Sequence, residues 1–368
     1  MTSGAPFQSI HISSRSRILI SGAVLLSLVV AVLVWWRNAP PEPKDPATSF
    51  SSVAAPVEEE DETTARETPF PPGEESVAAA VPPVPRKIAS LELPYGDGPG
   101  SVGLLDHPEQ DIAGAESFAV GAGGAFLVVD TVNQRLLRAD AENGDVTEIQ
   151  LPADAVAADL AVDSQGRWLV FDYAGRIDWY DERGERRGSL AVDLYQWEVR
   201  TGLRVVGDLL LMSDVDQRDH LLAVLEPDGP RTPLPDELVE WNGAGFLTES
   251  GTRHTAGLER WERGWITSVG SDGTTNRFEV EAPGIVSLRV LGEDRQGGLH
   301  TQVERVENGR VVLEVHRFDS AGERTGLLRL PQNDYHHWTV RLLSIDEHGR
   351  VYQALPQADN FALNVFSY

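Results

Sequence analysis

The sequence predicts an all-β fold, a six-bladed β-propeller, from three observations. Similar segments recur at one interval, because Asp130, Asp172 and Asp214 lie 42 residues apart and each ends an apolar segment. These segments alternate apolar and polar residues and are rich in Val, Leu and Trp, which is typical of strands rather than of a two-helix repeat. Glycines that mark turns return with nearly the same period, which is that of a propeller blade.

Each predicted blade has a glycine turn between its first and second strands. A tight hairpin needs a residue with positive φ, which glycine adopts without strain. The turn glycines are Gly124, Gly166, Gly207, Gly251, Gly297 and Gly349. Two strand assignments fit residues 245–270, so the strands of blade four stay open at this point.

A strand at the start of the domain is predicted to close the ring. Predicted outer strands end in Leu-Pro at residues 146–152 and 324–331, and the same ending occurs at 87–94, before any complete blade. The carboxyl-terminal segment is one strand short of a blade. We therefore expect residues 87–94 to supply the missing outer strand and leave no open edge. The propeller is assigned to residues 87–368.

Residues 18–36 are predicted to form a transmembrane helix that serves as a signal anchor. This segment has 19 residues and no charge, and at ~1.5 Å per residue it reaches roughly 28 Å, the thickness of a hydrocarbon core. A cleaved signal peptide is the alternative, but Arg37 and Pro40 flank the nearest small residue, Ala39, and disfavour cleavage there.

The expected topology is a cytoplasmic tail at residues 1–17 and a propeller outside the cytoplasm. The basic residues on the two sides of the span are nearly balanced, so this expectation depends on the short tail and on the lack of a second span. Only Lys44 and Lys87 are lysines, a bias typical of a GC-rich bacterial genome. The predicted location is the bacterial inner (plasma) membrane, with the propeller periplasmic.

Residues 37–86 are predicted to be a disordered linker. This segment holds 11 of the 23 prolines and many acidic residues, and it can bury too little apolar area to offset the entropy of ordering. Within the predicted anchor, Ala23, Ser27 and Ala31 form a row of small residues that could pack two anchors together. Ordinary small residues facing lipid are the alternative.

Composition excludes several classes of function. The formal net charge is −26, and an acidic surface repels phosphate backbones, so no nucleic-acid partner is expected. Cysteine is absent, which excludes disulfides, thiolate zinc sites and a thiol nucleophile.

Residues 126–144, FLVVDTVNQRLLRADAENG, resemble the NHL-repeat family of propellers. The matching positions are Val128, Asp130, Asn133 and Arg135, followed by Gly144. Later repeats keep less of the pattern, namely Asp172 with Arg176 and Asp214 with Arg218. The resemblance implies that Asp, Asn and Arg brace the turn between the second and third strands by hydrogen bonds, with a ligand role as the alternative.

Few residues are candidates for a binding site. Regular spacing should place Asp130, Asp172 and Asp214 on one rim of the ring. There they are the best candidates to bind a ligand or to coordinate Ca²⁺. His336, His337 and Trp338 are adjacent, and the histidines are expected to be a pair in a surface loop, with entry of one histidine into the central channel as the alternative. The nine histidines show no metal-ligand spacing, and the residues before the turn glycines are apolar or small, so no catalytic metal is expected. Those residues are Val120, Val162, Val206, Leu247, Val290 and Ile345.

Two classes of function remain. The first is a non-enzymatic, membrane-anchored module that binds a protein partner or acts as a scaffold. The second is an extracytoplasmic propeller hydrolase or lyase, similar to lactonases, that uses a metal in the channel. The anchor, the linker and the lack of a catalytic constellation favour the first, and metal analysis would separate the two.

Overall fold

In the computed structural model, β-strands make up nearly all of the regular structure of the described residues. The described residues are 86–107, 111–192, 200–232, 245–259, 262–332, 336–337 and 339–368. Contacts divide the chain into Met1–Glu75 and Ser76–Tyr368, and every described residue belongs to the second unit. The predicted tail and membrane anchor, with Ala23, Ser27 and Ala31, lie outside the described residues, as does the linker up to residue 85. Within the described ranges no helix is long and apolar enough to span a bilayer.

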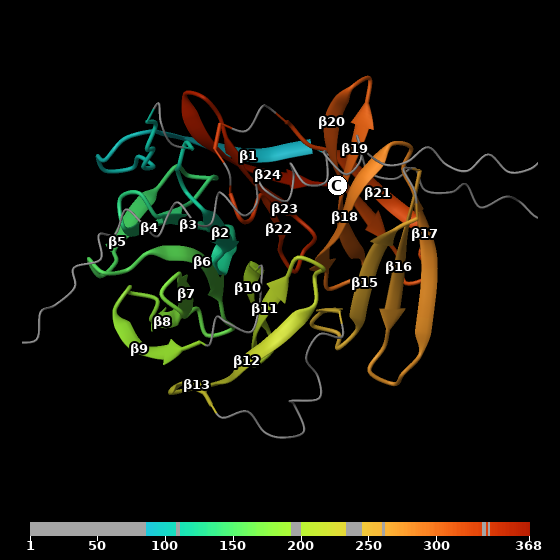
Figure 1. Ribbon diagram of the computed structural model, residues 1–368, viewed down its shortest axis with the longest axis horizontal. Coiled ribbons are helices and arrows are strands. Elements are labelled where there is room, and N and C mark those ends of the chain that lie inside the picture. The colour runs from blue at the N-terminus through green and yellow to red at the C-terminus, as the bar shows by residue number, and fades with distance from the viewer. Residues whose placement is uncertain are drawn as a thin grey trace, which may run out of the picture. The chain divides into compact units, whose positions relative to one another are not determined.

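Six four-stranded antiparallel sheets form a ring (Figure 1), which confirms the six predicted blades. Blades one to three, from the innermost strand outward, are β2 (Ser117–Val120), β3 (Phe126–Asp130), β4 (Arg135–Ala139) and β5 (Val146–Gln150); β6 (Ala157–Val162), β7 (Trp168–Asp172), β8 (Arg176–Tyr180) and β9 (Arg186–Ala191); and β10 (Arg200–Val206), β11 (Leu209–Asp214), β12 (Asp219–Glu226) and β13 (Gly229–Arg231). Blades four to six are β14 (Phe246–Leu247), β15 (Arg253–Leu258), β16 (Arg263–Val269) and β17 (Thr275–Glu281); β18 (Ile285–Glu293), β19 (Leu299–Glu307), β20 (Arg310–Phe318) and β21 (Arg324–Arg329); and β22 (Leu343–Ile345), β23 (Val351–Pro356), β24 (Asn360–Ser367) and β1 (Arg86–Pro94). A short 3-10 turn, η1 (Ala122–Gly124), follows β2.

The ring has two faces that differ in the loops they carry. Every sheet is antiparallel and repeats the same strand order, so strand ends alternate between the faces. We call the face with the turns between first and second strands the turn face; it also carries the turns between third and fourth strands. The connection face carries the loops between second and third strands and the links from blade to blade. All six predicted turn glycines lie on the turn face, with φ between 59° and 83°.

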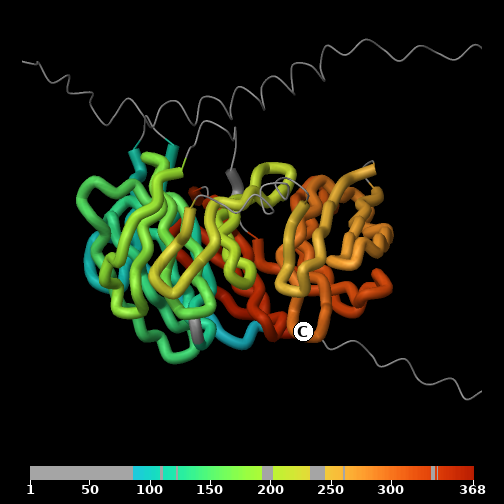
Figure 2. The backbone as a smooth tube through the Cα atoms, turned by 90° about the horizontal axis from the view of Figure 1, so that it is seen from below, coloured from blue at the N-terminus to red at the C-terminus, as the bar shows by residue number. Residues whose placement is uncertain are grey.

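The first described strand closes the ring, as predicted. β1 pairs antiparallel with β24, with Leu93 opposite Phe361 and Pro94 opposite Asn360, so the last blade takes its outer strand from the amino-terminal end. Figure 2 shows the blue start of the described chain beside the red carboxyl-terminal strand. Leu93 is 2% exposed and packs in the core between blades six and one. The strand starts at Arg86, one residue before the predicted boundary.

The hydrophobic core is divided into clusters between neighbouring blades, and the smallest joins blades three and four. It contains four buried residues, Val206, Leu211, Leu221 and Leu247, among the part of the chain that the structure describes. Blade four is unusual because its inner strand, β14, has two residues. This short strand explains why two strand assignments fitted the sequence of blade four.

Polar contacts from blade three hold the short strand β14 in place. Asp219 accepts a hydrogen bond from the backbone N–H of Leu247 at 2.7 Å and pairs with Arg204 at 2.7 Å. Arg204 also donates to the Leu247 carbonyl at 2.6 Å, and its guanidinium lies 3.4 Å from the centroid of the Phe246 ring. These contacts replace part of the packing that a longer inner strand would supply.

Candidate functional site

Asp130 braces the loop between β3 and β4 on the connection face. Its carboxylate accepts hydrogen bonds from the backbone N–H of Gly103 (3.0 Å) and of Asn133 (3.3 Å), from Asn133 Nδ2 (2.9 Å) and from Arg135 Nε (2.9 Å). Asp130 is fully buried and Arg135 nearly so. These contacts are the turn-bracing bonds that the NHL resemblance implies for these three side chains.

Asp172 and Asp214 occupy the equivalent positions at the ends of β7 and β11. Asp172 accepts hydrogen bonds from the backbone N–H of Val156 (3.0 Å) and of Ala174 (2.6 Å). Asp214 accepts from the backbone N–H of Asp216 and of Arg218, both at 2.9 Å. All three aspartates therefore lie on the connection face, as their spacing predicts, and their carboxylates accept hydrogen bonds from the loops and links of that face. No group of three or more His, Asp or Glu side chains within the described ranges is placed to hold a metal ion.

His336 and His337 lie in the link between β21 and β22, beside the first residues of the domain. His337 is buried, stacks on Phe361 with ring centroids 6.0 Å apart, and lies edge-on to Tyr95 at 6.2 Å. His336 lies 6.3 Å from the same tyrosine. This arrangement places the histidine pair against the last blade, while Trp338 lies outside the described residues.

Arg341 crosses the centre of the ring and joins four blades, a role that the sequence analysis missed. It lies just before β22 in blade six, and its guanidinium donates to the carbonyls of Phe118 (3.2 Å), Leu160 (3.4 Å) and Leu203 (2.7 Å). It also pairs with Asp159 of β6 at 3.2 Å. Asp159 in turn accepts hydrogen bonds from Ser117 Oγ and from the Leu203 backbone N–H.

A carboxyl group with a shifted pKa lies at the same end of the channel. Glu116 directly precedes β2, and its Oε2 accepts a hydrogen bond from the Tyr173 hydroxyl at 2.8 Å. Burial raises the pKa of Glu116 to about 7, the tyrosine hydrogen bond acts in the opposite direction, and the nearby Asp159 carboxylate raises it further. The sequence offered no sign of this site, since Tyr173 lies 57 residues away along the chain.

Replacing Glu116 with Gln is expected to change the pH dependence of stability. The folded-state pKa of about 7 lies above the ordinary value of 4.5, so the folded protein keeps a proton that the unfolded chain loses between these values. The free energy of unfolding therefore falls as pH rises through this window, by on the order of 3 kcal/mol. Urea unfolding should show wild type and Glu116→Gln nearly equal at about pH 4.5 and the variant more stable at about pH 8. A difference that does not change with pH would contradict the raised pKa.

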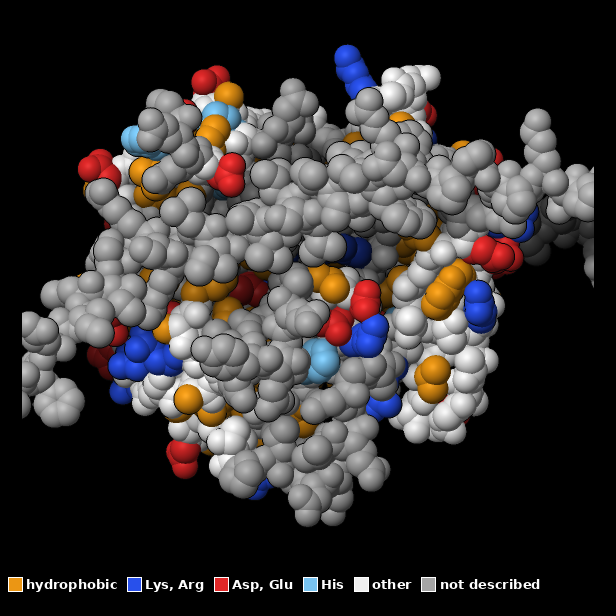
Figure 3. Space-filling model, viewed as in Figure 1, with side chains coloured by type: hydrophobic (Ala, Val, Ile, Leu, Met, Phe, Trp, Pro, Cys, Tyr) orange, Lys and Arg blue, Asp and Glu red, His pale blue; other side chains and the backbone are white. Residues whose placement is uncertain are grey.

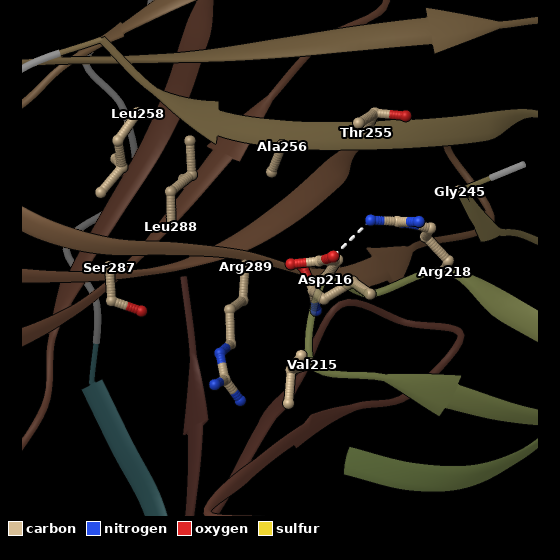
Figure 4. Close-up of a pocket in the computed structure, with 11 residues that line it drawn as sticks. Val215, Asp216, Arg218, Gly245, Thr255, Ala256, Leu258, Ser287, Leu288 and Arg289 are labelled. Carbon is tan, nitrogen blue, oxygen red and sulfur yellow. Dashed lines mark hydrogen bonds and ion pairs between the residues drawn. The ribbon is translucent and has the colours of Figure 1, made fainter. Parts of the chain in front are cut away.

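A groove of about 530 Å³ opens on the connection face between blades three, four and five. Its walls are the loop Val215–Arg218, the second half of β15 and residues Ser287–Arg289 of β18 (Figure 4). The Gln217 side chain fixes the loop to blade five, because it donates to the Val290 carbonyl at 3.0 Å and accepts from the Val290 N–H at 2.8 Å. The short β14 leaves the space that forms this groove.

Among the described residues, most of the exposed large apolar side chains lie on the connection face. Ten large hydrophobic residues are exposed in the part of the chain that the structure describes, and seven of them lie in the loops, links or strand ends of this face. The seven are Leu105, Val156, Tyr173, Val215, Leu258, Val306 and Val311. Figure 3 shows one face of the ring, on which hydrophobic side chains are interspersed with acidic and basic ones.

Comparisons with known proteins find solved structures of low sequence identity and do not assign a function. None of the protein-family models matches the chain, and no curated protein matches it. Virginiamycin B lyase from Staphylococcus aureus is 13% identical, with 73% of this chain and 99% of that chain covered and a TM-score of 0.39. BamB from Moraxella catarrhalis is 11% identical, with 78% and 98% covered and a TM-score of 0.35. The sheet topology shows a six-bladed β-propeller, whereas membership of the NHL-repeat family stays a prediction.

Proposed function

We propose that the protein is a membrane-anchored, extracytoplasmic β-propeller that binds another protein through its connection face and has no catalytic role. One observation carries the binding part: seven of the ten exposed large hydrophobic residues in the described ranges lie on that face. Protein interfaces combine apolar and aromatic side chains at their core with polar ones at their rim, so the face with more exposed apolar side chains is the better candidate for a partner. Loops held by a rigid scaffold are also the usual place for binding residues.

Cross-linking from single positions in the full-length chain tests this proposal. A photoreactive phenylalanine analogue would replace Tyr173, Val215 or Val306 on the connection face, and Val269 on the turn face as the control. Val269 is 38% exposed and therefore offers a comparable surface position. After irradiation of the native cells, the three connection-face positions are expected to give one common adduct that Val269 does not give. Adducts from Val269 alone, or from no position, would contradict the proposal.

The membrane part of the proposal rests on residues 18–36, and a reporter fusion tests it. Their 19 uncharged residues are long enough for one span, and the poor cleavage site favours an uncleaved anchor. Fused after Tyr368, a reporter that works only outside the cytoplasm is expected to be active, and the chain should keep its amino terminus. Activity of a cytoplasm-only reporter would reverse the topology, and a mature amino terminus near Pro40 would remove the anchor.

The non-catalytic part of the proposal includes the absence of a catalytic metal. The carboxylates of Asp130, Asp172 and Asp214 accept hydrogen bonds from backbone N–H groups of connection-face loops and links, which leaves them poorly placed to replace the hydration shell of Ca²⁺. A stoichiometric metal in the purified full-length chain, lost on chelation together with hydrolase or lyase turnover, would favour the enzyme instead. Self-association through Ala23, Ser27 and Ala31 also stays a proposal.

A further inference from the structure

On its inner side β15 extends beyond β14, the only described strand that is hydrogen-bonded to it there, and this part of β15 lines the groove. The backbone N–H of Glu259, just after β15, donates to the Arg263 carbonyl of β16 at 2.9 Å. In an antiparallel pair, every second residue of a strand forms its backbone hydrogen bonds with the same neighbouring strand. With the β15–β16 register, Thr255 and Gly257 therefore bond to β16, whereas His254, Ala256 and Leu258 direct their N–H and C=O groups to the opposite side. β14 reaches only as far as His254 on that side.

Among the described residues, Ala256 and Leu258 consequently have backbone groups on their inner side that no strand pairs. No described residue pairs with their inner N–H and C=O groups, and both residues line the groove. Leu258 is 42% exposed and Ala256 is half-buried, so solvent reaches this part of the strand. An open edge of this kind is a template for another strand, because the main-chain groups of an extended segment can complete the ladder.

The opposite wall of the groove carries a cation that lacks a partner. Arg289 of β18 is half-buried, and no carboxylate, carbonyl or aromatic ring among the described residues forms an ion pair, hydrogen bond or ring contact with its guanidinium. In Figure 4 this guanidinium points away from the ion pair of Asp216 and Arg218. The chain has 57 acidic and 31 basic residues, so carboxylates are plentiful, and yet none of the described ones pairs with Arg289. This arrangement favours binding of an anionic group of another molecule by the Arg289 guanidinium.

We infer that the groove binds an extended segment of the partner protein as an added strand on β15, with a carboxylate of that segment on Arg289. This inference deepens the proposed function, on which it rests, by naming the form and charge of the ligand. The backbone of the segment pairs with Ala256 and Leu258, which makes binding tolerant of sequence. Arg289 then selects segments that carry an acidic side chain or a terminal carboxylate.

A library of random displayed dodecapeptides, selected on the full-length protein, tests the inference. Wild type is expected to enrich acidic peptides, whose affinities are then measured by fluorescence polarisation. Ala256→Pro removes an N–H that faces the groove and no bond to β16, so the sheet is kept while peptide affinity falls roughly tenfold. Ala256→Ser keeps the N–H and should bind like wild type.

Charge reversal supplies the second arm, which does not depend on proline being tolerated. Arg289→Glu is expected to weaken the acidic peptides by roughly tenfold and to enrich basic peptides in a new selection. Arg324→Glu, at an exposed position at the start of the outer strand β21, is the matched control and should leave both results unchanged.

Two results would overturn the inference. One is a selection in which no peptide depends on Arg289, and the other is peptide affinity that Ala256→Pro leaves intact in a folded variant. If either occurs while the connection-face cross-links form, the inference fails and the proposed function stands. If the cross-links are absent, the proposed function itself fails.

Discussion

A chain without residues 1–95 is expected to lose cooperative folding, whereas a chain without residues 1–85 keeps it. The longer deletion removes β1, which pairs with β24 over eight register positions and buries Leu93. Losing one buried leucine costs about 2–5 kcal/mol, and the lost ladder adds several hydrogen bonds at about 0.5–1.5 kcal/mol each. That total is comparable with the whole stability of a domain, about 5–15 kcal/mol. The exposed edge of β24 should also promote aggregation.

Single substitutions in the complete chain check the same closure without a deletion. Leu93→Asp places a carboxylate in the core between blades six and one and is expected to cost about 4 kcal/mol or more. Ile88→Asp is the matched control on the same strand, because Ile88 is 39% exposed, and it should cost less than about 1 kcal/mol. Urea unfolding followed by tryptophan fluorescence measures both. Equal stability of the two variants, or of the two deletions, would disprove closure by β1.

Arg341→Met is expected to destabilise the ring by about 3–5 kcal/mol, because it leaves the Asp159 carboxylate buried without its cation. The substitution also removes the donors to three backbone carbonyls in three other blades. Arg295→Met is the control, since Arg295 is 66% exposed and pairs with Glu347 on the turn face. A surface pair of this kind is worth about 0–1 kcal/mol.

A double-mutant cycle separates the ion pair from general packing. Arg341→Met with Asp159→Leu removes both charges, and the coupling between the two sites is expected to reach about 2 kcal/mol. Purely additive effects, or an Arg341→Met variant no less stable than Arg295→Met, would show that the central contacts do not hold the blades together.

The candidate site was predictable from the sequence only where its contacts are local. Asp130, Asn133 and Arg135 lie within six positions of one another, so a repeat motif could indicate their shared turn. Arg341 reaches partners 138, 181 and 223 residues away, and no local pattern encodes such separations. The sequence offered one indication of this role, because Arg341 directly precedes the mainly apolar residues 342–345. If these residues line the channel, the arginine beside them is buried and needs a partner for its charge.

The sequence by itself determined the number of blades, their glycine turns and the strand that closes the ring. These features depend on properties that repeat along the chain: alternation with a period of two, positive φ at turn glycines, and Leu-Pro at the ends of outer strands. Only the tertiary structure decided that β14 stops after two residues, that Arg341 joins four blades, and that Arg289 lines the same groove as the free part of β15. The reason is physical, because these features arise where blades distant in the chain meet, and the energy of a buried charge or an unpaired edge depends on which neighbours the fold supplies.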